Sequence, residues 1–128
     1  EDISEKLRLK EIINKITGEL SSGQKNRVSL AKSIINDPKI LLLDEPTASL
    51  DPETGDFVRS FLEDYQKEKG ASILLASHNM AEVKRLCSSV LMMNNGVIID
   101  QGSPSKLIER HGRKNMEEVF LKLARKTI

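Results

Sequence analysis

Apolar residues recur along this chain with periods that predict helices alternating with short buried strands. Over residues 1–16, five aliphatic side chains at near-helical spacing predict an amphipathic helix, which residues 17–18 (Thr-Gly) would end. A second helix is predicted over residues 22–36, and the Asp-Pro pair at 37–38 stops it. The continuous apolar run at residues 39–44 then predicts a parallel strand that is covered on both faces.

The second half of the chain continues the alternation. Asp51 is the predicted N-cap of a third helix, with Pro52 as its first residue and Gly70 as its stop. A strand follows at residues 72–76, and after it a short helix that ends near Cys87. The remaining predicted elements are a hairpin of strands 89–94 and 97–101 around Asn95-Gly96, a helix over 103–112, and a last helix that Asn115 caps.

This order of elements predicts an α/β fold whose main strands are parallel. In such sheets ligands bind at the carboxyl ends of the strands. Asp44 and Glu45 end one predicted strand and His78 follows the next, so these side chains are expected to converge at one edge. Neighbouring residues of an extended segment point to opposite sides, so the two carboxylates are expected to differ in role. One can orient a hydrated Mg²⁺ while the other faces a water molecule near a terminal phosphate.

Composition narrows the class of protein. The chain has 128 residues, 38% of them hydrophobic and 30% charged, which is near the average of globular proteins. A net charge of +1 and only four aromatic residues (three Phe and one Tyr) argue against a nucleic-acid partner. The single Cys87 excludes an internal disulfide framework. No apolar stretch approaches the length of a membrane span, and a first residue other than Met suggests an excised or truncated segment.

The candidate chemistry begins at the run LSSGQ, from Leu20 to Gln24, which opens the second predicted helix. A helix N-terminus with free backbone N–H groups suits a phosphate. None of the seven glycines, however, begins the pattern G-x-x-x-x-G-K-[ST], in which a glycine-rich loop and a lysine hold the phosphates of a nucleotide. The sequence therefore combines phosphate-reading and metal-binding residues without the loop that would hold the nucleotide itself.

Taken together, these residues resemble the nucleotide-binding domain of ATP-binding cassette (ABC) proteins, strongly over residues 19–104 and weakly at both ends. Residues 20–24 match the signature motif, although Ser22 stands where the usual signature has the first of two glycines. Residues 40–45 match the Walker B strand with its catalytic glutamate, residues 48–51 match the D-loop, and His78 matches the switch histidine.

The resemblance implies part of a P-loop NTPase (RecA-like) core with parallel strands and a C-terminal hairpin. Residues 1–36 would be the end of the helical subdomain with the signature helix, and residues 37–128 the C-terminal part of the ATPase core. In this family two domains face each other head to tail and hold each ATP between them. The chain alone lacks the phosphate loop, so we expect it neither to bind ATP tightly nor to hydrolyse it.

The resemblance also implies roles for individual residues. Asp44 would help hold Mg²⁺ through water, Glu45 would polarise the attacking water, and His78 would contact the γ-phosphate. Asp51 would cross the dimer interface and couple the two sites. The residues that would meet the γ-phosphate of the ATP bound by the partner domain are Ser21, Ser22, Gly23 and Gln24.

The implied function is that of a transport ATPase subunit. Its partners would be a second nucleotide-binding domain and transmembrane permease subunits, and it would lie at the cytoplasmic face of the membrane. Residues 77–83 and 116–121 resemble the ABC-2 type branch that exports drugs, sodium or polysaccharides. Two alternatives stay open: a non-transport ABC ATPase of translation, DNA repair or chromosome maintenance, and an inactive fragment that only dimerises.

Each motif also has a purely structural interpretation. The Ser21 to Gln24 spacing is that of a capping box, and Asp51 is a competent helix cap. Asp44 and Glu45 could form an acidic turn after a strand, and a lone His is more often structural than functional. The order of the four motifs favours the functional interpretation for all of them.

Overall fold

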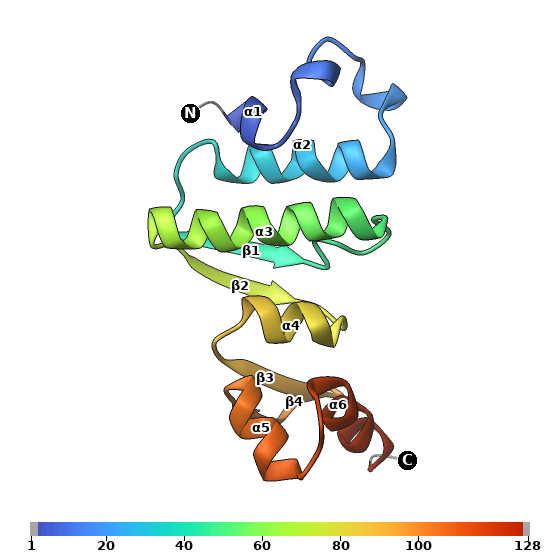
Figure 1. Cartoon of the computed structure of the whole chain (residues 1–128), viewed down its shortest axis with the longest axis vertical. Coiled ribbons are helices and arrows are strands. Elements are labelled where there is room, and N and C mark those ends of the chain that lie inside the picture. The colour runs from blue at the N-terminus through green and yellow to red at the C-terminus, as the bar shows by residue number, and fades with distance from the viewer. Residues whose placement is uncertain (1–2, 127–128) are drawn as a thin grey trace. The chain divides into compact units, whose positions relative to one another are not determined.

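A computed structural model of the chain describes residues 3–126. The described residues form two compact units, one up to Ala76 and one from Ser77 onward, each with its own sheet (Figure 1). No helix among the described residues is both long enough and apolar enough to cross a bilayer. The predicted division at residue 36 into a helical part and a core part stays a prediction.

The first unit contains the longest helices and the parallel strands. Its elements are α1 (Ile3–Lys6), two 3₁₀ turns at Lys10–Ile12 and Thr17–Glu19, α2 (Ser22–Ile34), β1 (Ile40–Asp44), α3 (Pro52–Lys69) and β2 (Ser72–Ala76). The second unit contains α4 (Met80–Leu86), β3 (Val90–Asn94), β4 (Val97–Gly102), α5 (Pro104–His111) and α6 (Met116–Arg125).

The strands of the first unit confirm the predicted α/β fold. β1 and β2 pair in parallel, with Ile40 opposite Ser72 and Asp44 opposite Ala76, and α3 connects them. Both strands therefore end at the same edge of the sheet. Just beyond that edge the backbone N–H of Glu45 donates a 2.8 Å hydrogen bond to the carbonyl of Ala76.

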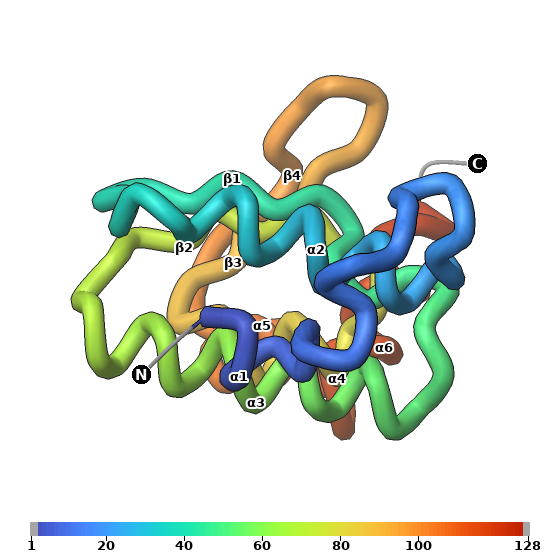
Figure 2. Tube along the Cα trace, turned by 90° about the horizontal axis from the view of Figure 1, so that it is seen from above, coloured from blue at the N-terminus to red at the C-terminus, as the bar shows by residue number. Residues whose placement is uncertain are grey.

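The two faces of this sheet differ in burial. α3 runs along one side of β1 and β2 (Figures 1 and 2), and on that side Leu41 is only 3% exposed. On the opposite face Ile40, Leu42 and Leu74 are 63–69% exposed. The sequence predicted cover on both faces because the run is apolar throughout. Within the described residues only the face toward α3 is buried.

The predicted helix over residues 1–16 is wrong. Arg8 has a φ of +53°, which no α-helix tolerates, and it separates α1 from the following 3₁₀ turn. The guanidinium of Arg27 in α2 stabilises this break, since its Nη1 donates to the carbonyls of Leu7 (3.2 Å) and Arg8 (3.1 Å). As a result Ile13 and Ile16 are 67% and 72% exposed instead of facing a core. Residues 1–2 of the predicted helix lie outside the described residues.

The second unit packs a hairpin against three helices. The predicted hairpin is confirmed, with Asn95 and Gly96 at φ +48° and +75° in the turn between β3 and β4. The predicted cap of the last helix is confirmed too, because Asn115 Oδ1 accepts from the N–H of Glu118 at 2.9 Å. Seven buried side chains form the core: Val83, Val90, Met92, Leu107, Met116, Val119 and Leu123.

Candidate functional site

The start of α2 carries the candidate phosphate-binding residues. Ser21 is the N-cap: its Oγ accepts from Gln24 N at 3.2 Å, and Gln24 Oε1 accepts from Ser21 N at 3.0 Å. This is the capping box that the spacing predicts. The first intrahelical bond runs from Lys25 N to Ser21 O, so the N–H groups of Ser22 and Gly23 stay directed out of the helix end. That end is suited to an anion.

The same helix end lies against the loop that follows β1. Asn26 Nδ2 donates a 2.7 Å hydrogen bond to the carbonyl of Pro46. A Cβ atom placed on Gly23 would lie 3.6 Å from Leu50 and 3.8 Å from Thr54. The first unit therefore brings the LSSGQ helix start and the loop after the acidic pair together.

The acidic pair sits at the end of β1. Asp44 is the last residue of the strand and is exposed, while Glu45 is half-buried and has a φ of +48°. A positive φ at a residue other than Gly is uncommon and is often found at functional sites. The chain thus leaves the extended conformation at Glu45, so strand alternation no longer decides where its side chain points. The rule that successive strand residues point to opposite faces therefore applies to the side chain of Asp44 but not to that of Glu45.

The surroundings of Asp44 fit a magnesium ion that arrives with a nucleotide. Its carboxylate is exposed and has no hydrogen-bond or ion-pair partner among residues 3–126. Mg²⁺ keeps several water ligands and is commonly bound by one or two carboxylates together with phosphate oxygens. The described residues contain no cluster of three or more acidic, His or Cys side chains that could hold a metal without such help.

Asp51 caps α3, as the sequence predicts. Its Oδ2 accepts from Thr54 N at 3.0 Å and its Oδ1 from the Thr54 hydroxyl at 2.6 Å. These hydrogen bonds hold the pKa of Asp51 below its usual value. The cap is confirmed, whereas the predicted role at a dimer interface stays a prediction.

His78 belongs to the second unit, where it lies between Ser77 and the α4 cap Asn79 and is exposed. The first unit holds the other candidate residues, namely Ser21 to Gln24, Asp44, Glu45 and Asp51. The predicted convergence of His78 with the acidic pair stays a prediction.

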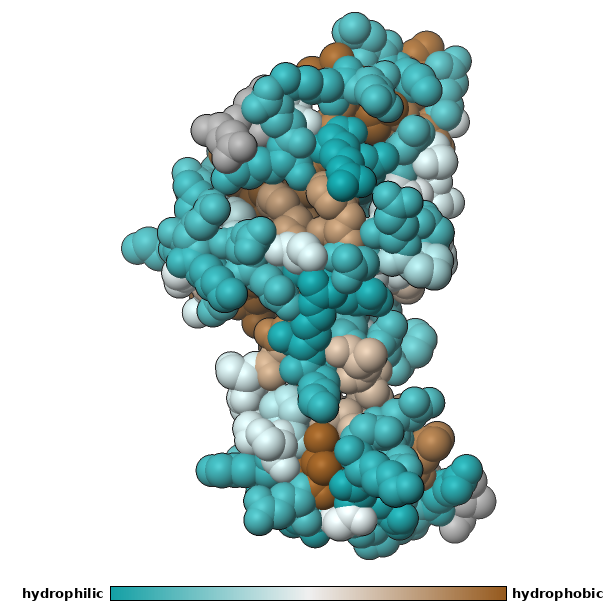
Figure 3. All heavy atoms as spheres, viewed as in Figure 1, coloured by the Kyte–Doolittle hydropathy of each residue, from teal (hydrophilic) through white to brown (hydrophobic). Residues whose placement is uncertain are grey.

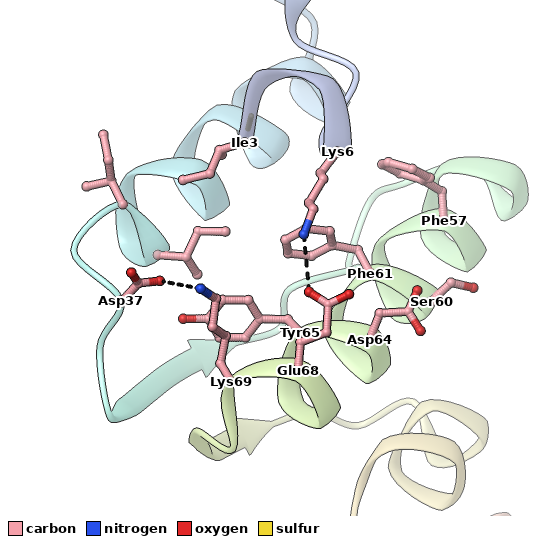
Figure 4. Close-up of a pocket in the computed structure, with 12 residues that line it drawn as sticks. Ile3, Lys6, Asp37, Phe57, Ser60, Phe61, Asp64, Tyr65, Glu68 and Lys69 are labelled. Atoms are coloured by element: carbon pink, nitrogen blue, oxygen red, sulfur yellow. Dashed lines mark hydrogen bonds and ion pairs between the residues drawn. The ribbon is translucent and has the colours of Figure 1, made fainter. Parts of the chain in front are cut away.

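A hollow that the sequence did not predict lies between α1, α2 and α3, with a volume of about 450 Å³ (Figure 4). In Figure 3 hydrophobic residues are visible between hydrophilic ones at the level of α2 and α3. Phe57, Phe61 and Tyr65, one helical turn apart on α3, line it, and the last two stack with ring centroids 6.1 Å apart. Two ion pairs border it: Lys6–Glu68 and Asp37–Lys69, both at 3.2 Å. None of the candidate phosphate, metal or catalytic residues lines this hollow.

Comparison with known proteins agrees with this geometry. The family model described as ABC transporter matches residues 1–48. The chain is 35% identical over 121 residues to the ABC transporter ATP-binding protein NatA of Bacillus subtilis, covering 94% of this chain and 49% of that protein. It is 41% identical over 106 residues to the methionine import ATP-binding protein MetN of Streptococcus agalactiae, covering 83% and 30% respectively.

A solved structure of an ATP-binding subunit of an ABC transporter matches with a TM-score of 0.80 and 25% identity, over 95% of this chain and 51% of the other. The chain therefore spans about half or less of the length of these relatives. The ABC-2 export branch that residues 77–83 and 116–121 suggested is not supported, since several relatives are named for methionine import.

Proposed function

Because this chain belongs to the family of ABC transporter ATP-binding domains, we propose that it forms the part of such a domain that runs from the signature motif onward. The observation that supports this most is the contact between the start of α2 and the loop after Asp44 and Glu45. This contact supports the proposal because the phosphate-suited helix end and the loop that follows the acidic pair touch within one unit. Residues 1–36 would then be the end of the helical subdomain and residues 37–128 the later part of the ATPase core.

The proposed reaction is ATP hydrolysis coupled to transport. The Ser21 hydroxyl, the Gln24 side chain and the N–H groups of Ser22 and Gly23 would face the γ-phosphate of an ATP molecule held by a partner domain. Asp44 would hold Mg²⁺ through the water shell of the ion. When bound, Mg²⁺ supplies charge stabilisation to the transferred phosphoryl group.

Glu45 would orient the attacking water and His78 would donate a hydrogen bond to the γ-phosphate. Asp51 would keep its cap on α3 and face the partner domain, which its exposed position permits. Phosphoryl transfer depends mainly on positioning and charge stabilisation, so groups fixed on helix caps and strand ends are suited to it.

The proposed partners are a second nucleotide-binding domain and transmembrane permease subunits, and the proposed location is the cytoplasmic face of the membrane. The relatives are named as ATP-binding proteins of transporters, which favours a transport subunit over the ATPases of translation or DNA repair. A purely dimerising fragment is disfavoured for the same reason. No nucleic-acid partner is proposed, because the net charge is only +1.

Glu45→Gln in the complete subunit tests this function. The amide keeps the size of the side chain but is a poor base, so ATP turnover should fall by at least about a hundredfold while ATP binding persists. Glu53→Gln, a change of the same kind at an exposed residue of α3, is the matched control and should leave turnover unchanged. Normal turnover in Glu45→Gln would contradict the proposed role.

The chain of residues 1–128 by itself provides the second test. Calorimetric titration with ATP and Mg²⁺ should give no appreciable affinity, and no phosphate should be released. Tight binding by this chain without a partner would contradict the composite site.

A further inference from the structure

Three hydrogen bonds form a closed ring around the turn that carries His78. The Ser77 hydroxyl donates to Glu82 Oε2 at 2.6 Å, and the N–H of Asn79 donates to Ser77 Oγ at 3.1 Å. The ring closes where the N–H of Glu82 donates to Asn79 Oδ1, also at 3.1 Å. The residues on both sides of His78 are therefore tied to one another and to the first turn of α4.

Glu82 is the unusual member of this ring. It is 1% exposed, although a carboxylate is among the groups that are most costly to bury without compensation. Its place in the first turn of α4 and the short bond from Ser77 provide such compensation. The charge of Glu82 also acts on the neighbouring thiol of Cys87. The pKa of Cys87 is raised first by its own burial and second by the negative charge of Glu82. A plain core position would be filled more favourably by an apolar side chain.

We propose that Glu82 is a positioning residue that fixes the backbone on both sides of His78, so that the exposed imidazole is presented in one orientation. The proposal rests on the proposed function, in which His78 meets a γ-phosphate. The buried carboxylate holds Ser77, Ser77 holds Asn79, and Asn79 caps the helix from which Glu82 itself projects. A loop that must place one hydrogen bond accurately benefits from supports of this kind.

A merely structural Glu82 would stabilise the second unit as a whole, and amide hydrogen exchange in the chain separates the two cases. In Glu82→Ala the Asn79 amide should exchange at least about tenfold faster, because Ser77 Oγ loses the acceptor that orients it. Glu82→Gln keeps an acceptor oxygen at the same length and should restore slow exchange. Ser77→Ala removes the acceptor of the Asn79 N–H without opening a cavity at Glu82, and should reproduce the fast exchange even if Glu82→Ala folds poorly.

Val83→Ala is the matched control for stability. Val83 follows Glu82, is 6% exposed and packs in the core of the same unit, yet takes no side-chain part in the ring. Truncating the Val83 side chain should lower the stability of the unit. The Asn79 amide should then exchange faster only by the factor that this loss of stability explains. If Asn79 exchanges no faster in Glu82→Ala and Ser77→Ala than in Val83→Ala at equal stability, the positioning role is overturned.

The functional arm uses the complete subunit and a double-mutant cycle. Glu82→Ala should lower kcat for ATP hydrolysis with little change in KM, and adding it to His78→Ala should cause no further loss, since it acts through that residue. Losses that multiply would overturn the proposal. If His78→Ala alone leaves turnover unchanged, the proposed function of His78 fails, while the exchange experiment still decides whether Glu82 orders the turn.

Discussion

The side chain of Asn26 is hydrogen-bonded to the backbone carbonyl of Pro46, 20 residues away, at 2.7 Å. Asn26 lies on α2, one turn after the LSSGQ helix start, and Pro46 directly follows the acidic pair. One hydrogen bond thus joins the candidate phosphate-binding end to the candidate catalytic loop.

Replacing Asn26 by Asp tests this connection. The substitution keeps the shape of the side chain but removes the donor, and it sets a carboxylate against the carbonyl of the buried Pro46. The loss of a part-buried hydrogen bond costs about 1 kcal/mol, so the free energy of unfolding should fall by that amount in urea titrations. Lys25→Ala, at the exposed neighbouring position, is the control. An unchanged unfolding midpoint in Asn26→Asp would show that the bond does not form in solution.

Ser21 allows the cap and the phosphate contact to be separated. Ser21→Ala should lower the stability of the chain by about 1 kcal/mol, because Gln24 N loses its acceptor. Ser21→Asp is an equally good cap and should keep the stability, but its negative charge should repel the γ-phosphate and reduce ATP hydrolysis in the complete subunit. Ser21→Asn, a neutral cap, serves as the control. Full activity in Ser21→Asp would mean that this helix end does not face a phosphate.

The exposed sheet face predicts self-association of the isolated chain. Ile40, Leu42 and Leu74 present an apolar surface on a two-stranded sheet, and parallel sheets are normally covered on both sides. Light scattering should show oligomers of the chain at high concentration. The double change Leu42→Ser and Leu74→Ser should reduce them and leave the fold intact.

Leu41 provides the control for that experiment, because it neighbours Leu42 in sequence but faces α3 and is 3% exposed. Leu41→Ser should unfold the unit or destabilise it strongly, since it buries a hydroxyl in an apolar site. A clean monomer at high concentration in the unmodified chain would contradict the predicted self-association.

Local signals explain which elements the sequence predicts well. The limits of α3 follow from three residues that each act on their own neighbours. Asp51 caps the helix, Pro52 fixes φ in its first turn, and Gly70 ends it in the left-handed conformation. Asn95 and Gly96 define the hairpin in the same way. Such features need no knowledge of distant parts of the chain.

Features that depend on distant contacts were missed. The break at Arg8 is held by Arg27, 19 residues away, and nothing in the local pattern of residues 1–16 announces it. The positive φ of Glu45 and the hollow between α1, α2 and α3 likewise arise from tertiary structure. The candidate site was identified by the order of its motifs, but the ring around His78 was not, because it depends on a carboxylate whose burial the sequence does not show.

The pair Asp100 and His111 predicts a pH dependence of stability in the second unit. His111 Nε2 lies 2.6 Å from Asp100 Oδ2, and Arg110 pairs with the other oxygen of the same carboxylate. The hydrogen bond from His111 is the largest of the effects that hold the pKa of Asp100 below its usual value; the N–H of Gln101 and the charge of Arg110 add to it, and partial burial opposes it. A carboxylate whose pKa is lowered by folding stabilises the folded state above its unfolded pKa, about 3.9, and loses that contribution as pH falls through the lower folded value.

Asp100→Asn should therefore lower the Tm at pH 7, and the difference from the unmodified chain should shrink as the pH is taken below about 4. Asp64→Asn, at an exposed residue without an ion pair among the described residues, should show no such trend. A Tm difference for Asp100→Asn that stays constant down to the acid limit of folding would mean that the substitution acts through packing and not through the charge of the carboxylate.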